Sequence, residues 1–246
     1  MTLFLASVRN CHEAETACAE GADVIDLKEP NAGALGAVER ATMIEAVRQV
    51  GGRVAVSATV GDLPMRPRTL REAIQATAQC GVDFVKFGLF PGEGAEECLE
   101  ALRSSARDTR LIVVLFADRL PEFDAVTAAV RMGASGLMLD TAGKGHGSLL
   151  DHLSLEAIAS MVGRAKTQGL SVGLAGSLKA DQVARLLAFG PDLLGFRGAL
   201  CRGSDRSAAL DREACRYIRT LIPRNEVSPL ERSNPPGHSL PAEALC

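Results

Sequence analysis

The sequence contains few aromatic residues and no long apolar run. Tryptophan is absent, tyrosine occurs once, and aromatic residues make up 4% of the 246 positions. Alanine, leucine and valine must therefore fill the core of any fold that this chain adopts. No apolar run approaches the roughly 20 residues that a membrane-spanning helix needs. We therefore expect no membrane partner.

Blocks of positive charge, a secretion signal and paired cysteines are also missing. The formal net charge is −3, and without a basic patch we expect no nucleic-acid partner. The first residues lack the basic start of a signal peptide. Seven cysteines occur without any Cys-x-x-Cys pair, which indicates free thiols and a cytoplasmic location. The four histidines show no ligand spacing, so we expect no metal and no cofactor.

Lysine is scarce in a chain that otherwise uses arginine as its cation. Of the 27 basic residues only five are lysine, so each lysine position needs a separate explanation. They are Lys28, Lys86, Lys144, Lys166 and Lys179.

Apolar strand-like runs alternate with helical patterns along the chain. The expected strands are residues 3–6, 24–27, 53–59, 82–87, 110–115, 136–139, 170–175 and 193–196. The expected helices cover about 11–20, 38–50, 94–107, 155–168, 180–189 and 205–222, and two more begin near 69 and 121. Eight such units predict a single-domain (β/α)8 TIM barrel over residues 1–222. A doubly wound open sheet is the alternative.

Polar side chains gather at the predicted carboxyl ends of the strands, where such barrels bind substrate. A lysine held there can attack a carbonyl once it loses its proton, and clustered cations favour that loss. A set of structural ion pairs is the alternative interpretation. The catalytic candidates are Asp26, Lys28, Lys86, Asp140 and Lys144, and Ser57 and Thr59 are candidates for binding the substrate or its phosphate.

The turns after the seventh and eighth strands are rich in small residues. Gly176-Ser177 and Arg197-Gly198 follow those strands, and backbone N–H groups in such turns can approach an anion. Barrels often bind phosphate there. We therefore predict a phosphate site and a small phosphorylated substrate, with ordinary turns as the alternative.

Six stretches together resemble the (5-formylfuran-3-yl)methyl phosphate synthase family. The resemblance covers about residues 3–222 and includes every predicted strand end. The stretches are DLKEPNAGALG (26–36), VSATVGDLP (56–64), DFVKFGL (83–89), LDTA (139–142), LAGSL (174–178) and GFRGA (195–199).

The resemblance implies a metal-independent lyase that condenses two molecules of glyceraldehyde 3-phosphate into a furan precursor of methanofuran. It implies that Lys28 forms a Schiff base and that Lys86 transfers protons. Asp26, Asp140 and Lys144 match the supporting polar residues of the family. In an organism that is not a methanogen, it suggests a one-carbon pathway with a methanofuran-like carrier. We also expect a homo-oligomer.

Two other functions remain compatible with the residues alone. One is a class I aldolase of another sugar phosphate, and the other is a phosphate-binding barrel without catalysis. Turnover of glyceraldehyde 3-phosphate to a furan aldehyde would distinguish the furan phosphate synthase from the aldolase and from the non-catalytic barrel.

Residues 223–246 have four prolines after Pro223 and no apolar period, which predicts a disordered tail, with a partner-binding arm as the alternative. A chain that ends at Arg224 should therefore keep its turnover and its melting temperature, as measured by activity assay and thermal unfolding. A large loss of either would show that the tail packs on the barrel or bridges subunits.

Overall fold

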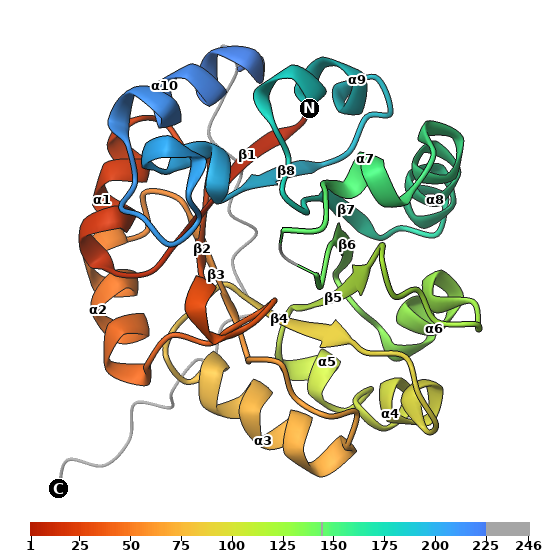
Figure 1. Cartoon of the computed structure of the whole chain (residues 1–246). Helices are drawn as coiled ribbons and strands as arrows, with labels where there is room; N and C mark the ends of the chain where they lie inside the picture. Colours follow the sequence, from red (N-terminus) through yellow and green to blue (C-terminus); the bar gives the residue numbers. More distant parts are fainter. Residues whose placement is uncertain (144, 225–246) are drawn as a thin grey trace, which may run out of the picture.

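The chain folds as a closed barrel of eight parallel strands, in the computed structural model that describes residues 1–143 and 145–224. Each strand pairs with the next in the sequence, and β8 pairs with β1 (Figure 1). This confirms the predicted TIM barrel and excludes the open sheet. The strands are β1 Leu3–Val8, β2 Val24–Leu27, β3 Ala55–Thr59, β4 Phe84–Leu89, β5 Leu111–Phe116, β6 Gly136–Asp140, β7 Ser171–Leu174 and β8 Leu193–Phe196.

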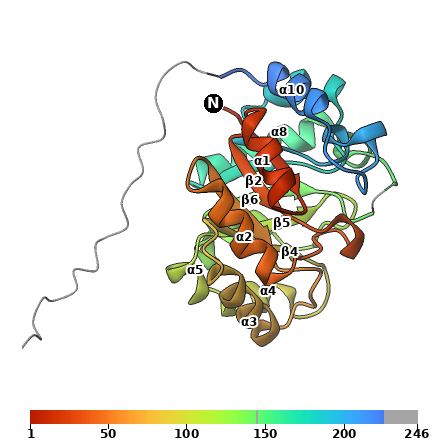
Figure 2. The same ribbon diagram turned by 90° about the vertical axis from the view of Figure 1, so that its left-hand side faces the viewer.

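Helices surround the barrel, and Figure 2 shows α1, α2 and α3 along its outer side. The α-helices are α1 Cys11–Ala19, α2 Arg40–Val50, α3 Pro67–Ala78, α4 Ala95–Ala101, α5 Ser105–Asp108, α6 Ala125–Met132, α7 Leu149–His152, α8 Leu155–Thr167, α9 Val183–Leu187 and α10 Arg212–Leu221. Short 3-10 turns are η1 Pro30–Ala32, η2 Ala180–Gln182, η3 Gly198–Leu200 and η4 Arg202–Ser204.

Some helix boundaries differ from the prediction. Helix α6 begins after Asp124, whose side chain accepts from the backbone N–H of Thr127, and not at Pro121. The helix expected over 94–107 is divided into α4 and α5. The last helix begins at Arg212 because Asp211 caps it, so residues 205–211 are a loop and not the first turns of α10.

Two apolar cores follow from the alternation of side chains along each strand. Outward-facing strand residues pack against the helices and form the larger core. Inward-facing residues form a second, separate cluster inside the barrel. Its strand residues include Leu5, Val24, Val114, Phe116 and Met138.

The inward-facing positions become polar toward the carboxyl ends of the strands. Two residues beyond Leu5 and Val24 stand Ser7 and Asp26, and the two are register partners on β1 and β2. Asp140 likewise lies two residues beyond Met138. On β1, β2 and β6 the inward positions are therefore polar near the carboxyl ends, where the site residues lie, whereas β5 stays apolar as far as Phe116, the register partner of Asp140.

The predicted tail from residue 225 lies outside the described residues. The chain is followed as far as Arg224, whose guanidinium donates to the carbonyl oxygen of Gly21 at 2.8 Å. Within residues 1–143 and 145–224, no helix combines the length and apolarity needed to cross a membrane.

A substitution at Gly88 tests the packing inside the barrel. A Cβ at this position would lie 2.9 Å from the rings of Phe116 and Phe90. We expect Gly88→Ala to lower the free energy of unfolding by about 1–3 kcal/mol through overpacking, as measured by denaturant or thermal unfolding.

The matched control is Gly163→Ala on the exposed face of α8, where an added Cβ meets nothing within 4 Å. This change should stabilise the chain by up to about 1 kcal/mol. Equal stability of the two variants would contradict the described packing around Gly88.

Candidate functional site

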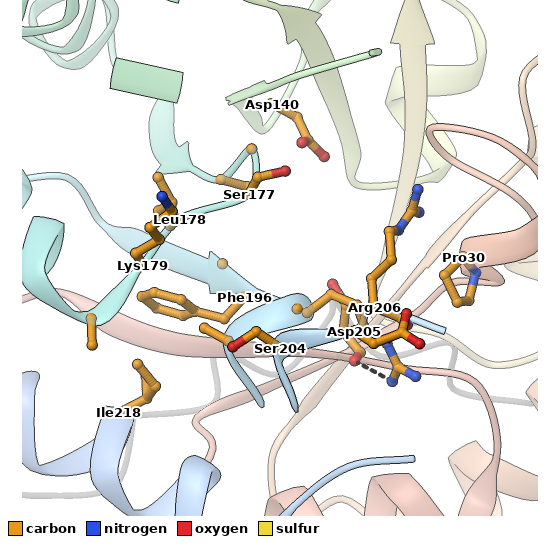
Figure 3. A pocket seen from close by; sticks show the side chains of 18 of the residues that line it. Pro30, Asp140, Ser177, Leu178, Lys179, Phe196, Ser204, Asp205, Arg206 and Ile218 are labelled. Carbon is orange, nitrogen blue, oxygen red and sulfur yellow. Dashed lines mark hydrogen bonds between the residues drawn. The ribbon is translucent and has the colours of Figure 1, made fainter. Parts of the chain in front are cut away.

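A cavity of about 690 Å³ opens at the carboxyl ends of the strands. This volume falls in the range of about 300–1,000 Å³ found for small-molecule sites. Its wall includes the end of β2, the end of β6, the turns after β7 and β8, and part of the loop before α10 (Figure 3). The polar side chains among the lining residues include Ser7, Lys28, Asp140, Ser177, Lys179, Arg197, Ser204, Asp205 and Arg206.

Lys28 and Asp140 form an ion pair in the cavity wall. The Nζ atom of Lys28 donates to Oδ2 of Asp140 at 3.2 Å, and both residues are buried, at 7% and 4% exposure. The other carboxylate oxygen of Asp140 accepts from the backbone N–H of Thr141 at 2.7 Å. The amine of Lys28 is therefore held in a fixed position while it still borders the cavity.

Lys86 and Asp26 form a second ion pair deeper in the barrel. Lys86 Nζ lies 2.8 Å from Asp26 Oδ1. The Asp26 carboxylate also accepts from the hydroxyls of Ser57 at 2.7 Å and Ser7 at 3.0 Å. Among the described residues, Lys86 and Asp26 are not part of the cavity wall. This pair supports the site from beneath.

The two ion pairs each join side chains from different parts of the barrel. Asp26 lies two residues before Lys28 on the same strand face, a spacing that would allow the two to pair along β2. The structure instead pairs Asp26 with Lys86 on β4 and Lys28 with Asp140 on β6. Each carboxylate thus neutralises a lysine from a different strand, which lowers the cost of burying four charges.

Ser57 and Thr59 lie beside the lysines but outside the cavity wall. The hydroxyl of Ser57 donates to Asp26, and that of Thr59 donates to the carbonyl oxygen of Gly36 at 3.0 Å. Both side chains are fully or almost fully buried. The structure thus gives these two hydroxyls protein partners, in place of the direct phosphate contact expected from the sequence.

The turn after β7 offers backbone N–H groups to the cavity. Gly176 and Ser177 both have positive φ, at 95° and 51°. A side chain at 176 would meet the backbone nitrogen of Thr141 at 3.0 Å, so only glycine fits there. Within the described residues the backbone N–H groups of Ser177 and Leu178 donate no hydrogen bond. They are therefore available to a ligand.

Arg197 borders the same cavity, but its guanidinium is occupied by the protein. It donates to Glu13 and to the carbonyl oxygens of Ser7, Arg206 and Ala208. All five N–H groups of the side chain are thereby used. The expected pairing of Arg197 with phosphate is corrected to a structural role, in which it ties the loop before α10 to β1 and α1.

Glu13 on α1 completes this contact, with its side chain only 4% exposed. Burial raises the pKa of Glu13, but the hydrogen bonds and charges of Arg197 and Arg9 together outweigh burial and hold that pKa below its ordinary value. The pair is therefore ionised at neutral pH. The backbone N–H groups of Gly198 and Ala199, next in the chain, donate no hydrogen bond within the described residues.

Lys144 lies outside the described residues. The residues before it are fixed by Asp118, whose carboxylate accepts from the backbone N–H groups of Ala142 and Gly143, both at 2.7 Å. Burial raises the pKa of Asp118, but these two hydrogen bonds outweigh it and lower the pKa overall. Across residues 1–143 and 145–224, no group of three or more His, Cys, Asp or Glu side chains is placed to hold a metal ion.

The sequence reasoning missed Ser7, Lys179 and Arg206. Ser7 lies one residue before the end of β1, and its inward position was predictable from the alternation that places Leu5 in the core. Lys179 lies two residues after Ser177 and lines the cavity. Arg206 was hidden because its segment was assigned to a helix. Burial lowers the pKa of Arg206, with Asp140 opposing and Arg197 adding to this effect.

Solved structures resemble the chain in fold. The CutC protein of Streptococcus agalactiae, titled a putative copper homeostasis protein, superposes with a TM-score of 0.65 at 14% identity, over 79% of this chain and 98% of that one. Phosphoribosyl anthranilate isomerase from Thermus thermophilus gives 0.62 at 16% identity, over 90% and 98%. At these identities the likeness concerns the barrel fold alone.

Sequence relatives are closer. The (5-formylfuran-3-yl)methyl phosphate synthase of Methanocaldococcus jannaschii is 36% identical over 233 residues, which cover 89% of this chain and 99% of that protein. The synthase of the same name from Methanopyrus kandleri is 37% identical over 216 residues, or 83% and 91%. The profile described as 4-HFC-P synthase matches residues 4–219. The chain belongs to the 4-HFC-P synthase family.

Proposed function

We propose that this chain is a (5-formylfuran-3-yl)methyl phosphate synthase that condenses two molecules of glyceraldehyde 3-phosphate through a Schiff base on Lys28. The family relationship supports the product. The position of Lys28 is the observation that carries the mechanism, because its amine borders the cavity and pairs with Asp140. Lys86 lies deeper, beside Asp26.

The first steps use the chemistry of a primary amine. Deprotonated Lys28 attacks the aldehyde carbon of one triose phosphate, and the carbonyl oxygen leaves as water. The protonated imine acidifies the proton on carbon 2. Removal of that proton lets phosphate leave from carbon 3 as the double bond shifts. Asp140 balances the positive charge of the amine and of the imine that replaces it.

The skeleton of the product defines the remaining steps. The furan carries a phosphorylated CH₂ group two ring positions from the carbon that bears the aldehyde. Carbon 3 of the bound triose must therefore join carbon 2 of the second triose. For this bond to form, the second triose has to react as a ketone, after a proton has moved from its carbon 2 to its carbon 1. Ring closure follows. One phosphate and two waters leave overall, so that the atoms balance.

Lys86 is assigned the proton transfers. General acid–base groups need a fixed position within reach of the proton that they move. The Asp26 carboxylate holds the Lys86 amine at 2.8 Å, while Ser7 and Ser57 fix that carboxylate in turn. Ser7 also borders the cavity, so this network reaches from the buried lysine to the substrate space.

One phosphate group is assigned to the turns after β7 and β8. The N–H groups of Ser177, Leu178, Gly198 and Ala199 support this assignment, because they have no acceptor among the described residues. The Ser177 hydroxyl faces the same space (Figure 3).

The product is assigned to the biosynthesis of methanofuran or of a similar one-carbon carrier. We place the reaction in the cytoplasm, since the six cysteines among the described residues are free thiols. A homo-oligomer stays a prediction. The direct test of the function is incubation with glyceraldehyde 3-phosphate, which should give a furan aldehyde and one inorganic phosphate per product.

Replacing each site lysine by arginine separates the two roles. Lys28→Arg keeps the charge beside Asp140 but removes the usable nucleophile. Turnover should fall on the order of 10,000-fold or more, and borohydride should no longer trap substrate on the protein. Lys86→Arg should reduce turnover by about 100- to 10,000-fold while borohydride still traps substrate at Lys28. Mass spectrometry of peptides locates the adduct.

Lys166→Arg is the matched control, because Lys166 on α8 is partly exposed and pairs with Asp192. It should leave turnover and trapping unchanged. If Lys28→Arg still trapped substrate at Lys86 while Lys86→Arg trapped none, the roles of the two lysines would be reversed.

Crystals grown with phosphate or sulfate should hold an anion against the backbone N–H groups of Ser177 and Gly198. The physical reason is that these N–H groups have no acceptor within residues 1–143 and 145–224 and lie at the edge of a cavity. Anion density confined to other parts of the rim would contradict the assignment of this turn.

A further inference from the structure

Arg206 projects into the cavity from the loop between η4 and α10. Its side chain is half-buried and lines the cavity wall, and in Figure 3 its guanidinium points into the same space as the carboxylate of Asp140. Within the described residues its side chain makes one hydrogen bond, from NH2 to the carbonyl oxygen of Gly33 at 3.3 Å. Most of its N–H donors are therefore left for a ligand.

The backbone on both sides of Arg206 is fixed by other side chains. Arg197 donates to the carbonyl oxygens of Arg206 and Ala208, both at 2.9 Å. Arg9 donates to the carbonyl oxygen of Ser207 at 3.0 Å, and the Ser207 hydroxyl donates to Asn31 at 3.0 Å. The loop is thus held in place without the Arg206 guanidinium. A positioned cation with unused donors is a suitable binder for a phosphate group.

Arg206 and the turn after β7 lie on different sides of the cavity. Figure 3 shows Ser177 and Leu178 on one side, Arg206 and Pro30 on the other, and the Asp140 carboxylate between them. The contacts also place them on different sides, because Arg206 donates to Gly33 after β2 whereas Gly176 packs against Thr141 after β6. The cavity therefore offers two anion-binding walls with the Lys28–Asp140 pair between them.

We propose that Arg206 binds the phosphate group of the second triose phosphate, an inference that rests on the proposed function. Two phosphorylated substrates require two anion sites, and the turns after β7 and β8 supply one of them. The guanidinium remains charged in proteins. Two of its N–H groups can meet two phosphate oxygens in the planar geometry typical of arginine. Arg206 then places the second triose against the carbon activated at Lys28.

The test counts bound phosphate esters by isothermal titration calorimetry. Glycerol 3-phosphate is the probe, because it carries the phosphate of a triose but no carbonyl that could react with lysine. The natural chain should bind two equivalents. Arg206→Gln should keep one equivalent and bind the second about 10- to 100-fold more weakly. Arg206→Lys keeps a point charge without the bidentate geometry. Its affinity for the second equivalent should therefore lie between that of the natural chain and that of Arg206→Gln.

Arg202→Gln is the matched control. Arg202 is an exposed arginine of the same connection between β8 and α10 and does not line the cavity, so its substitution should leave both equivalents unchanged. Thermal unfolding of each variant checks the fold. One equivalent in the natural chain, or two unchanged equivalents in both Arg206 variants, would overturn the proposal.

Turnover measured on the same samples separates this inference from the proposed function. If the natural chain binds two equivalents but forms no furan aldehyde, the synthase proposal fails and Arg206 remains a phosphate-binding residue. If the furan forms at the natural rate in Arg206→Gln and two equivalents still bind, the Arg206 assignment fails and the synthase proposal stands.

Discussion

The burial of two lysine–aspartate pairs is the constraint on which the mouth of the barrel depends. Removing a charge from water costs several kcal/mol, and a partner alone does not recover that cost unless the remaining hydrogen-bond positions are also filled. The chain fills them with Ser7 and Ser57 around Asp26, and with the backbone of Thr141 beside Asp140. Ser57, which the sequence predicted as a substrate contact, is therefore part of the support for the Lys86–Asp26 pair.

The two pairs also connect strands that are not neighbours in the sheet. One joins β2 to β4 and the other joins β2 to β6, so both cross the interior of the barrel. Inward-facing residues of alternate strands share a layer in such barrels, and this layering brings side chains far apart in sequence to one level. The substrate space above them is bounded by loops, and Asp118 and Arg197 hold the backbones of two of these loops in place.

The fold was predictable because each strand is a short apolar run and each run is followed by a helical period. The residues at the strand ends were predictable for the same reason, as Asp26, Lys28, Lys86 and Asp140 come together at one mouth. The pairing of each carboxylate with a particular lysine was not predictable, because it depends on how the strands are arranged around the barrel. Arg206 was missed because the period of α10 was extended too far back, past the cap at Asp211.

The contact between Arg197 and Glu13 joins residues 184 positions apart in the chain. It links the segments that follow β1 and β8, at the carboxyl ends of these two paired strands, and holds the loop that carries Arg206. A growing polypeptide leaves the ribosome from its N-terminus. Lys28 and Lys86 therefore leave the ribosome well before Arg197 and Arg206, which belong to the last part of the barrel. The binding cavity is complete only when the last strand and helix have been synthesised and have docked onto the first unit.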